Sequence, residues 1–109
     1  MPKRIESPVK RFPGYVTLSD PLSFPQVIAY QDGISAAMEL GEATWSKIRH
    51  AVLPGILACV QEWGLEGVPD MPGVDTFPAT PLQSAGKLVE WLQNEITALL
   101  QEAETVPNE

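Results

Sequence analysis

The stretch TWSKIRHAVLPGILACVQEW, residues 44–63, contains an almost entirely apolar run from Ala51 to Val60. Apolar residues recur through the whole stretch at helical spacing, namely Trp45, Ile48, Val52, Ile56, Cys59, Val60 and Trp63. This period predicts a helix over residues 44–63 whose apolar face is deeply buried. Pro54 lacks the N–H of a helical hydrogen bond and clashes with the preceding turn, so we expect a kink or break before it.

A second helix is expected before this stretch. Ser23-Phe24-Pro25-Gln26 has the residues of a capping box, with a proline in the first turn, and Gly41 is a typical stop. The apolar residues at helical spacing are Phe24, Val27, Ile28, Ile34 and Met38, and the stripe is widened by Tyr30, Ala36 and Ala37. A stripe of this width indicates contact on more than one side of the helix.

A third helix is expected after it. Thr80-Pro81-Leu82-Gln83 repeats the start signal, with Pro81 at the first helical position. The stripe that follows is continuous and consists of Leu82, Ala85, Leu88, Val89, Leu92, Ile96, Leu99 and Leu100. Of the three helices, this one has the clearest pattern.

Residues 14–18, GYVTL, are the best strand candidate, because β-branched and aromatic residues lie between two turn signals. A lone strand leaves its backbone unpaired, so it must pair with residues 5–10 or with a strand of a second copy. With one strand beside three helices, the sequence predicts a mainly α fold. We expect a small three-to-four-helix domain with a short N-terminal extended segment.

The length and composition restrict the class of protein. The chain has 109 residues, a net charge of -7 and one cysteine, which fits one domain and excludes an internal disulfide framework or a Cys-cluster metal site. The acidic balance argues against direct binding to nucleic acid. No apolar run approaches the roughly 20 residues that span a bilayer, and no secretory signal is recognised. We therefore expect a cytoplasmic protein without a membrane partner, metal or cofactor.

Charge divides the chain. Residues 1–11 contain four basic residues and one acidic residue, a local charge of +3, whereas the remaining 98 residues carry a charge of -10. We divide the chain into a basic arm (1–11), a single helical domain (12–103) with a Pro/Gly-rich loop (64–80), and a polar tail (104–109). A basic arm beside an acidic body indicates head-to-tail contact between copies; the alternative is a frayed, solvated terminus. The candidate self-association residues are Lys3, Arg4, Lys10, Arg11, Tyr15, Val16 and Leu18.

No catalytic arrangement is recognised. His50 is the only histidine, and the sequence suggests neither a nucleophile nor an orienting partner for it. Cys59 lies in an apolar run and is expected to be buried. There is no phosphate-binding glycine pattern and no G-x-S-x-G elbow. The sequence therefore predicts a protein that is not an enzyme.

Aromatic residues are the best candidates for partner binding, because they concentrate binding energy at interfaces. Trp91 lies one position off the stripe of its helix and so flanks the core face, and Tyr30 has the same status on the first helix. The alternative is that the tryptophans belong to the core. The candidate partner-binding residues are Tyr30, Met38, Trp45, Trp63, Trp91 and Leu99.

The order of these segments resembles the small tail assembly chaperones of long-tailed bacteriophages and prophages. The resemblance covers about residues 11–100. The segments that carry it are RFPGYVTL (11–18), LSFPQV (22–27), LPGILACVQEW (53–63), WGLEGVP (63–69) and TFPATP (76–81).

The resemblance implies a helical, self-associating chaperone of viral assembly. Such proteins coat the apolar-rich tape-measure protein in the host cell cytoplasm before the tail tube polymerises around it, and they are absent from the finished particle. Many are made in two lengths by translational frameshifting. The implied partners are the tape-measure protein, further copies of the chain in a homo-oligomer, and a frameshifted longer form.

Two other functions remain open at this point. One is a structural component of the virion, such as a connector. The other is an acidic inhibitor or nucleic-acid mimic, which the charge of -10 after residue 11 favours.

Overall fold

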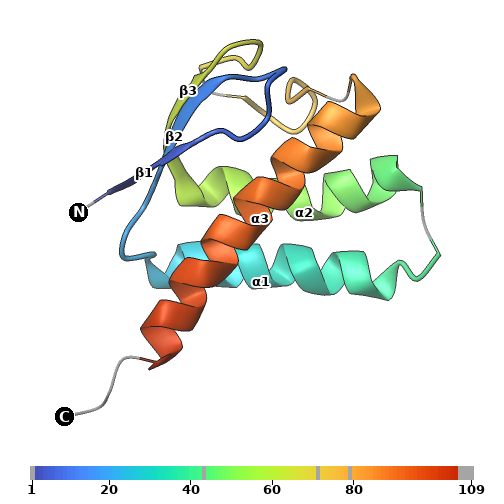
Figure 1. Ribbon diagram of the computed structural model, residues 1–109. Coiled ribbons are helices and arrows are strands. Elements are labelled where there is room, and N and C mark those ends of the chain that lie inside the picture. Colours follow the sequence, from blue (N-terminus) through green and yellow to red (C-terminus); the bar gives the residue numbers. More distant parts are fainter. Residues whose placement is uncertain (1, 43, 71, 79, 106–109) are drawn as a thin grey trace.

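The computed structural model describes residues 2–42, 44–70, 72–78 and 80–105 (Figure 1). Within these ranges the elements are β1 (Lys3–Glu6), β2 (Gly14–Leu18), α1 (Phe24–Glu39), α2 (Trp45–Cys59), β3 (Val60–Leu65) and α3 (Leu82–Thr105). The three strands form one antiparallel sheet, and the composition is 53% helix and 15% strand. The fold is therefore mixed α/β, and the prediction of a mainly α, three-to-four-helix domain is wrong.

The error arises at the end of the predicted second helix. α2 ends at Cys59, and the chain turns directly into β3. In β3 the buried residues Trp63 and Leu65 alternate with more exposed neighbours, which is the period of a strand. A few apolar residues at the boundary of an element fit a helical and a strand period equally well, so the pattern could not place this boundary.

β2 is the central strand of the sheet, whose order is β1-β2-β3. Val16 lies opposite Ile5 on one side and opposite Trp63 on the other. The strand candidate 14–18 thus has both of its partners within its own chain. Residues 3–6 of the predicted arm are an edge strand rather than a frayed end.

α2 runs through Pro54 as one continuous helix, so the expected kink or break is not a break. The neighbouring Gly55 has a role in packing: a Cβ there would lie 2.6 Å from the Tyr30 Cα of α1. A Cβ on Gly33 of α1 would likewise lie 2.9 Å from the Ala51 carbonyl oxygen of α2. The two helices therefore pack with their backbones close together, which only glycine permits at these points.

α1 begins with the predicted capping box. The Gln26 N–H donates to Ser23 Oγ at 3.4 Å, and the Ser23 N–H donates to Gln26 Oε1 at 2.7 Å. The Gln26 amide also donates to Ser19 Oγ and to the Ala58 carbonyl oxygen, so one side chain joins the end of β2, the start of α1 and the end of α2.

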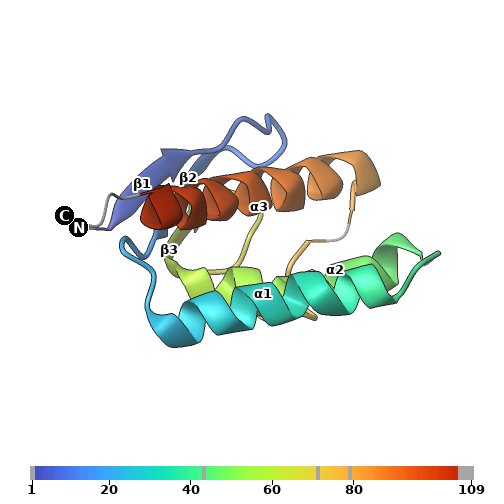
Figure 2. The ribbon, with the colours of Figure 1, turned by 90° about the horizontal axis from the view of Figure 1, so that it is seen from below.

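The core lies between α3, the α1–α2 pair and the sheet. Figures 1 and 2 show α1 and α2 side by side in one layer, α3 crossing obliquely over both, and the sheet beside α3. The predicted stripe of α3 is largely confirmed, since six of its residues are buried, namely Ala85, Leu88, Val89, Leu92, Ile96 and Leu99. The two exceptions are Leu100, which is partly buried, and Leu82, which is 60% exposed and occupies the first helical position that was predicted for Pro81.

The Pro/Gly-rich loop that leads into α3 is tied to α2. The buried guanidinium of Arg49 donates to the carbonyl oxygens of Val74 and Phe77. The Phe77 ring is buried edge-on against Trp63, with 5.9 Å between the ring centroids. The predicted polar tail (104–109) lies outside the described residues from position 106 onward.

Candidate partner-binding site

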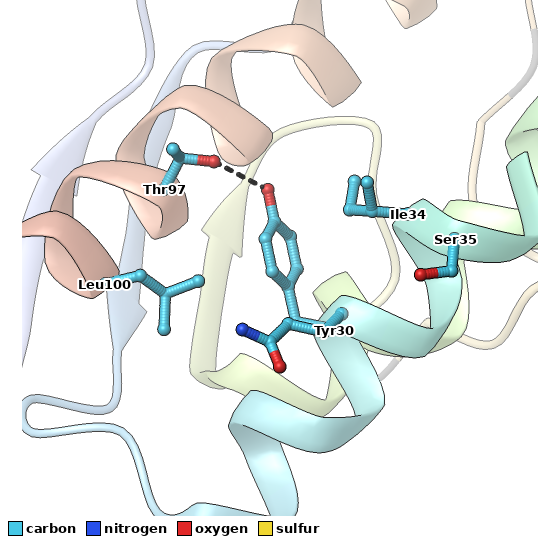
Figure 3. A pocket seen from close by; sticks show the side chains of 6 residues that line it. Tyr30, Ile34, Ser35, Thr97 and Leu100 are labelled. Atoms are coloured by element: carbon cyan, nitrogen blue, oxygen red, sulfur yellow. Dashed lines mark hydrogen bonds between the residues drawn. The ribbon is translucent and has the colours of Figure 1, made fainter. Parts of the chain in front are cut away.

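An open groove of about 440 Å³ lies between α1 and the C-terminal half of α3. We call it the α1–α3 groove. Figure 3 shows Tyr30 reaching from α1 toward α3, with Ile34 and Leu100 on opposite sides of its ring. The lining residues are Tyr30, Gln31, Ile34, Ser35, Thr97 and Leu100, none of which carries a charge at neutral pH.

Tyr30 forms the floor of this groove. Its hydroxyl donates to the Gln93 carbonyl oxygen at 3.0 Å and lies 3.0 Å from Thr97 Oγ1 (Figure 3). The pKa of this hydroxyl is raised, and burial is the largest cause of the shift. The group therefore stays protonated at neutral pH. The tyrosine thus fixes the spacing of α1 and α3 through its polar end, while its ring gives the groove an apolar base.

The outer face of α1 extends the apolar surface beyond the groove. Phe24 is 77% exposed, Ile28 is 41% exposed and Met38 is 77% exposed. We call these three residues the outer α1 stripe. They lie on the same helix face as Gln31 and Ser35 of the groove, because positions 24, 28, 31, 35 and 38 follow the helical repeat. An uncharged face with three large exposed apolar side chains therefore adjoins the groove.

The buried face of α1 is not the one that the apolar pattern predicted. The fully buried residues of α1 are Tyr30 and Gly33, whereas Phe24, Ile28 and Met38 of the predicted stripe point to solvent. Because Gly33 and Gly55 bring the backbones of α1 and α2 together, small residues make that contact and the large ones remain outside.

The structure brings only part of the predicted partner-binding set to this site. Tyr30 lines the groove and Met38 lies on the adjoining stripe. Trp63 and Leu99 are core residues, and Trp45 packs near Gly86 at the start of α3. Trp91 lines a different cavity, with Pro8. The prediction missed Ile34 and Thr97 as binding residues; the excess width of the α1 stripe was the signal that pointed to this face.

The predicted self-association residues divide in the same way. Val16 and Leu18 are completely buried in the sheet and therefore contribute to the core rather than to a contact between copies. The Arg4 guanidinium lies 4.0 Å from the centroid of the Tyr15 ring and 3.6 Å from a Glu6 carboxylate oxygen, both within the chain. Lys3 lies in β1, and Lys10 and Arg11 lie at the turn between β1 and β2.

Charge around the α1–α3 groove is of one sign. No Lys or Arg occurs between Arg11 and Lys47, a range that includes all of α1, and none occurs after Lys87 in α3. Asp32 and Glu39 are exposed on α1 beside the outer α1 stripe. The uncharged surface thus lies between helices whose only charges near it are negative.

The residues with possible chemistry are dispersed. Cys59 is buried, as expected, and burial raises the pKa of its thiol to about 11, so it is not a thiolate nucleophile at neutral pH. His50 is exposed, with Nδ1 2.8 Å from the Ser46 carbonyl oxygen. Across the described ranges, no three His, Cys, Asp or Glu residues are grouped so that they could hold a metal ion.

None of the helices described here is both long and apolar enough to cross a membrane. Comparison of the chain with protein-family models, with curated proteins and with solved structures finds no match. The fold and the site together define a small mixed α/β protein with an apolar groove between two helices. The function is therefore argued from this groove.

Proposed function

We propose that the protein is a tail assembly chaperone that self-associates and binds apolar helical segments of the tape-measure protein in the host cytoplasm. One observation carries the proposal: the α1–α3 groove continues onto the outer α1 stripe, so that uncharged surface extends along one side of the molecule. Large exposed apolar surfaces on soluble proteins are typical of interaction sites.

The shape of this surface fits a helix. A groove between two helices accepts the apolar face of a third helix, which presents side chains at positions i, i+3, i+4 and i+7. Met38 suits a binder of varied sequences, because its flexible side chain adapts to different neighbours. Ile34 and Leu100 supply the apolar walls.

The charge around the groove specifies the partner further. Asp32 and Glu39 favour a helix that carries Lys or Arg beside its apolar face. The same negative charge keeps copies soluble although apolar side chains are exposed. The proposal thus names a basic amphipathic segment of the tape-measure protein.

Substitution on the outer α1 stripe tests this proposal. We expect Ile28→Glu combined with Met38→Glu to weaken binding of a labelled tape-measure helix by about a hundredfold or more, because each of the two buried apolar side chains contributes about 1.5–3 kcal/mol. Fluorescence anisotropy measures the dissociation constant. The matched control is Leu82→Glu, which charges an exposed leucine about 27 Å along α3 from Leu100.

Three outcomes would contradict the proposal. Equal affinity of the double variant and the wild type would exclude the α1 surface. Binding that is lost at high salt but unaffected by the variants would favour an acidic inhibitor or mimic. Detection of the protein in purified virions by mass spectrometry would favour a structural component, because the proposed chaperone leaves the particle.

A further inference from the structure

A second groove lies on the other flank of α3, where the turn between β1 and β2 approaches the N-terminal half of the helix (Figure 2). It consists of two adjoining cavities of about 290 Å³ and 370 Å³, which share Pro8, Val9 and Lys87. We call it the turn–α3 groove. It is separate from the α1–α3 groove, and the proposed function does not use it.

Cations dominate this groove. Lys10, Arg11 and Lys87 line the smaller cavity together with Ser84, and the larger cavity adds Trp91 and one carboxylate, Glu90. Lys10, Arg11 and Lys87 are exposed, and none of the three forms an ion pair with another residue in the described part of the chain. Three cations with a hydroxyl and an indole beside them match an acidic segment that also carries apolar atoms.

The sequence after the groove supplies such a segment. The residues that follow Lys87 include Glu90, Glu95, Glu102, Glu104 and Glu109, and no Lys or Arg. The segment 101–109, QEAETVPNE, holds three of these five carboxylates within nine residues. The charge of this segment is therefore complementary to the charge of the turn–α3 groove.

Within one chain, the helical part of this segment lies far from the groove. Lys87, Glu102 and Glu104 belong to the same helix, which runs from Leu82 to Thr105. Fifteen residues of helix separate Lys87 from Glu102 by about 22 Å. Figure 1 shows the C-terminal end of α3 on the far side of the molecule from the β1–β2 turn. The helical part of the acidic segment can therefore reach the groove only from another molecule.

We infer that the turn–α3 groove of one copy binds the acidic C-terminal segment, residues 101–109, of a second copy. The contact is head-to-tail, so each copy uses its groove for one neighbour and its C-terminal segment for the next. The inference rests on the self-association in the proposed function and names the surfaces that make it. It leaves the α1–α3 groove of every copy open to the tape-measure protein.

Charge exchange tests this contact in the full-length protein. One variant carries Lys10→Glu and Lys87→Glu, and the other carries Glu102→Lys and Glu104→Lys. Sedimentation velocity over a concentration series is expected to show self-association of the wild type that weakens with salt, and about tenfold or more weaker association of each variant alone. An equimolar mixture of the two variants should associate again, because each supplies the charge that the other lacks.

Lys47→Glu is the matched control, since it reverses an exposed helical lysine outside the groove and should leave association unchanged. A mixture that stays monomeric would overturn the inference, as would variants that associate like the wild type. A wild type that is monomeric at high concentration would exclude a second copy as the occupant and point to an acidic segment of another protein. Tape-measure binding measured on the monomeric variants separates this inference from the proposed function, because loss of association alone leaves that binding intact.

Discussion

α1 and α3 form the two walls of one groove, yet they place their apolar side chains in opposite ways. In α3 the apolar residues Leu88, Leu92 and Ile96 are completely buried. In α1 the large apolar residues Phe24 and Met38 are each 77% exposed, and the contact with α2 is made around Gly33. One helix therefore stabilises the fold with its apolar stripe, and the other leaves much of its stripe exposed.

The difference shows that an apolar stripe on a helix does not identify the buried face when glycine is present. Close approach of two backbones buries small residues and excludes large side chains from the contact. The stripe of α1 then remains at the surface, where solubility has to be maintained by the neighbouring charges. The comparison predicts that substitutions in the two helices affect different properties.

The largest expected effect separates the two stripes. Leu92→Ala removes a fully buried side chain of α3 and should lower the free energy of unfolding by about 2–5 kcal/mol. Met38→Ala should change it by no more than about 0.5 kcal/mol, because the side chain is exposed. Urea denaturation followed by circular dichroism measures both. Similar costs for the two substitutions would show that the outer α1 stripe is part of the core.

The next effect concerns the glycine contact. Gly55→Ala places a Cβ 2.6 Å from the Tyr30 Cα, so α1 must shift, and we expect a loss of about 1–3 kcal/mol. Gly86→Ala in α3 is the matched control. Its Cβ meets the Trp45 ring at an ordinary 3.9 Å, and alanine should stabilise that helix by up to about 1 kcal/mol. Thermal denaturation reports opposite signs for the two variants; the same sign for both would refute close packing at Gly55.

A smaller effect is expected at the floor of the groove. Tyr30→Phe removes the hydroxyl that contacts Gln93 and Thr97 and should cost about 0.5–1.5 kcal/mol. Tyr15→Phe is the control, because the Tyr15 hydroxyl has no hydrogen-bond partner among the described residues. Chemical denaturation of both variants checks the difference. Equal losses would mean that the hydroxyl does not join α1 to α3.

The last prediction concerns the loss of folding stability at alkaline pH, which is absent at neutral pH. It involves two groups at the inner face of α1. Burial raises the pKa of Tyr30 and raises that of Cys59 from 9.0 to about 11, and the Cys59 thiol donates to the Gln26 carbonyl oxygen of α1. The folded state holds these protons more tightly than the unfolded state. The stability that they contribute is therefore full below pH 9 and is lost as the pH rises through 11.

Urea denaturation at a series of alkaline pH values measures this decline. Cys59→Ala should flatten it between pH 9 and pH 11, because the variant lacks the thiol that titrates there. A decline of the same slope in the variant would assign the loss to other groups.

The sequence predicted the start of α1 and most of the buried stripe of α3, but it placed the start of α3 one residue early, at Pro81, and it failed where tertiary contacts decide. The capping box at Ser23 is local, so four residues suffice to predict it. β3 depends on pairing with β2, a partner more than forty positions earlier in the chain, which no local pattern encodes. The groove was partly predictable, because Tyr30 and Met38 were selected as candidates. Ile34 and Thr97 were not, since their neighbourhood exists only once α1 and α3 cross.

The position of β2 at the centre of the sheet has a consequence for how the chain acquires its structure. Its pairing with β1 is local, but its pairing with β3 encloses α1 and α2 in one long loop from Ser19 to Cys59. Closing a loop of that length costs conformational entropy. This cost is smaller when the two helices have already packed against each other. A nascent chain that ends before Val60 lacks the strand that completes the sheet, so the sheet reaches its final form only after β3 has been synthesised.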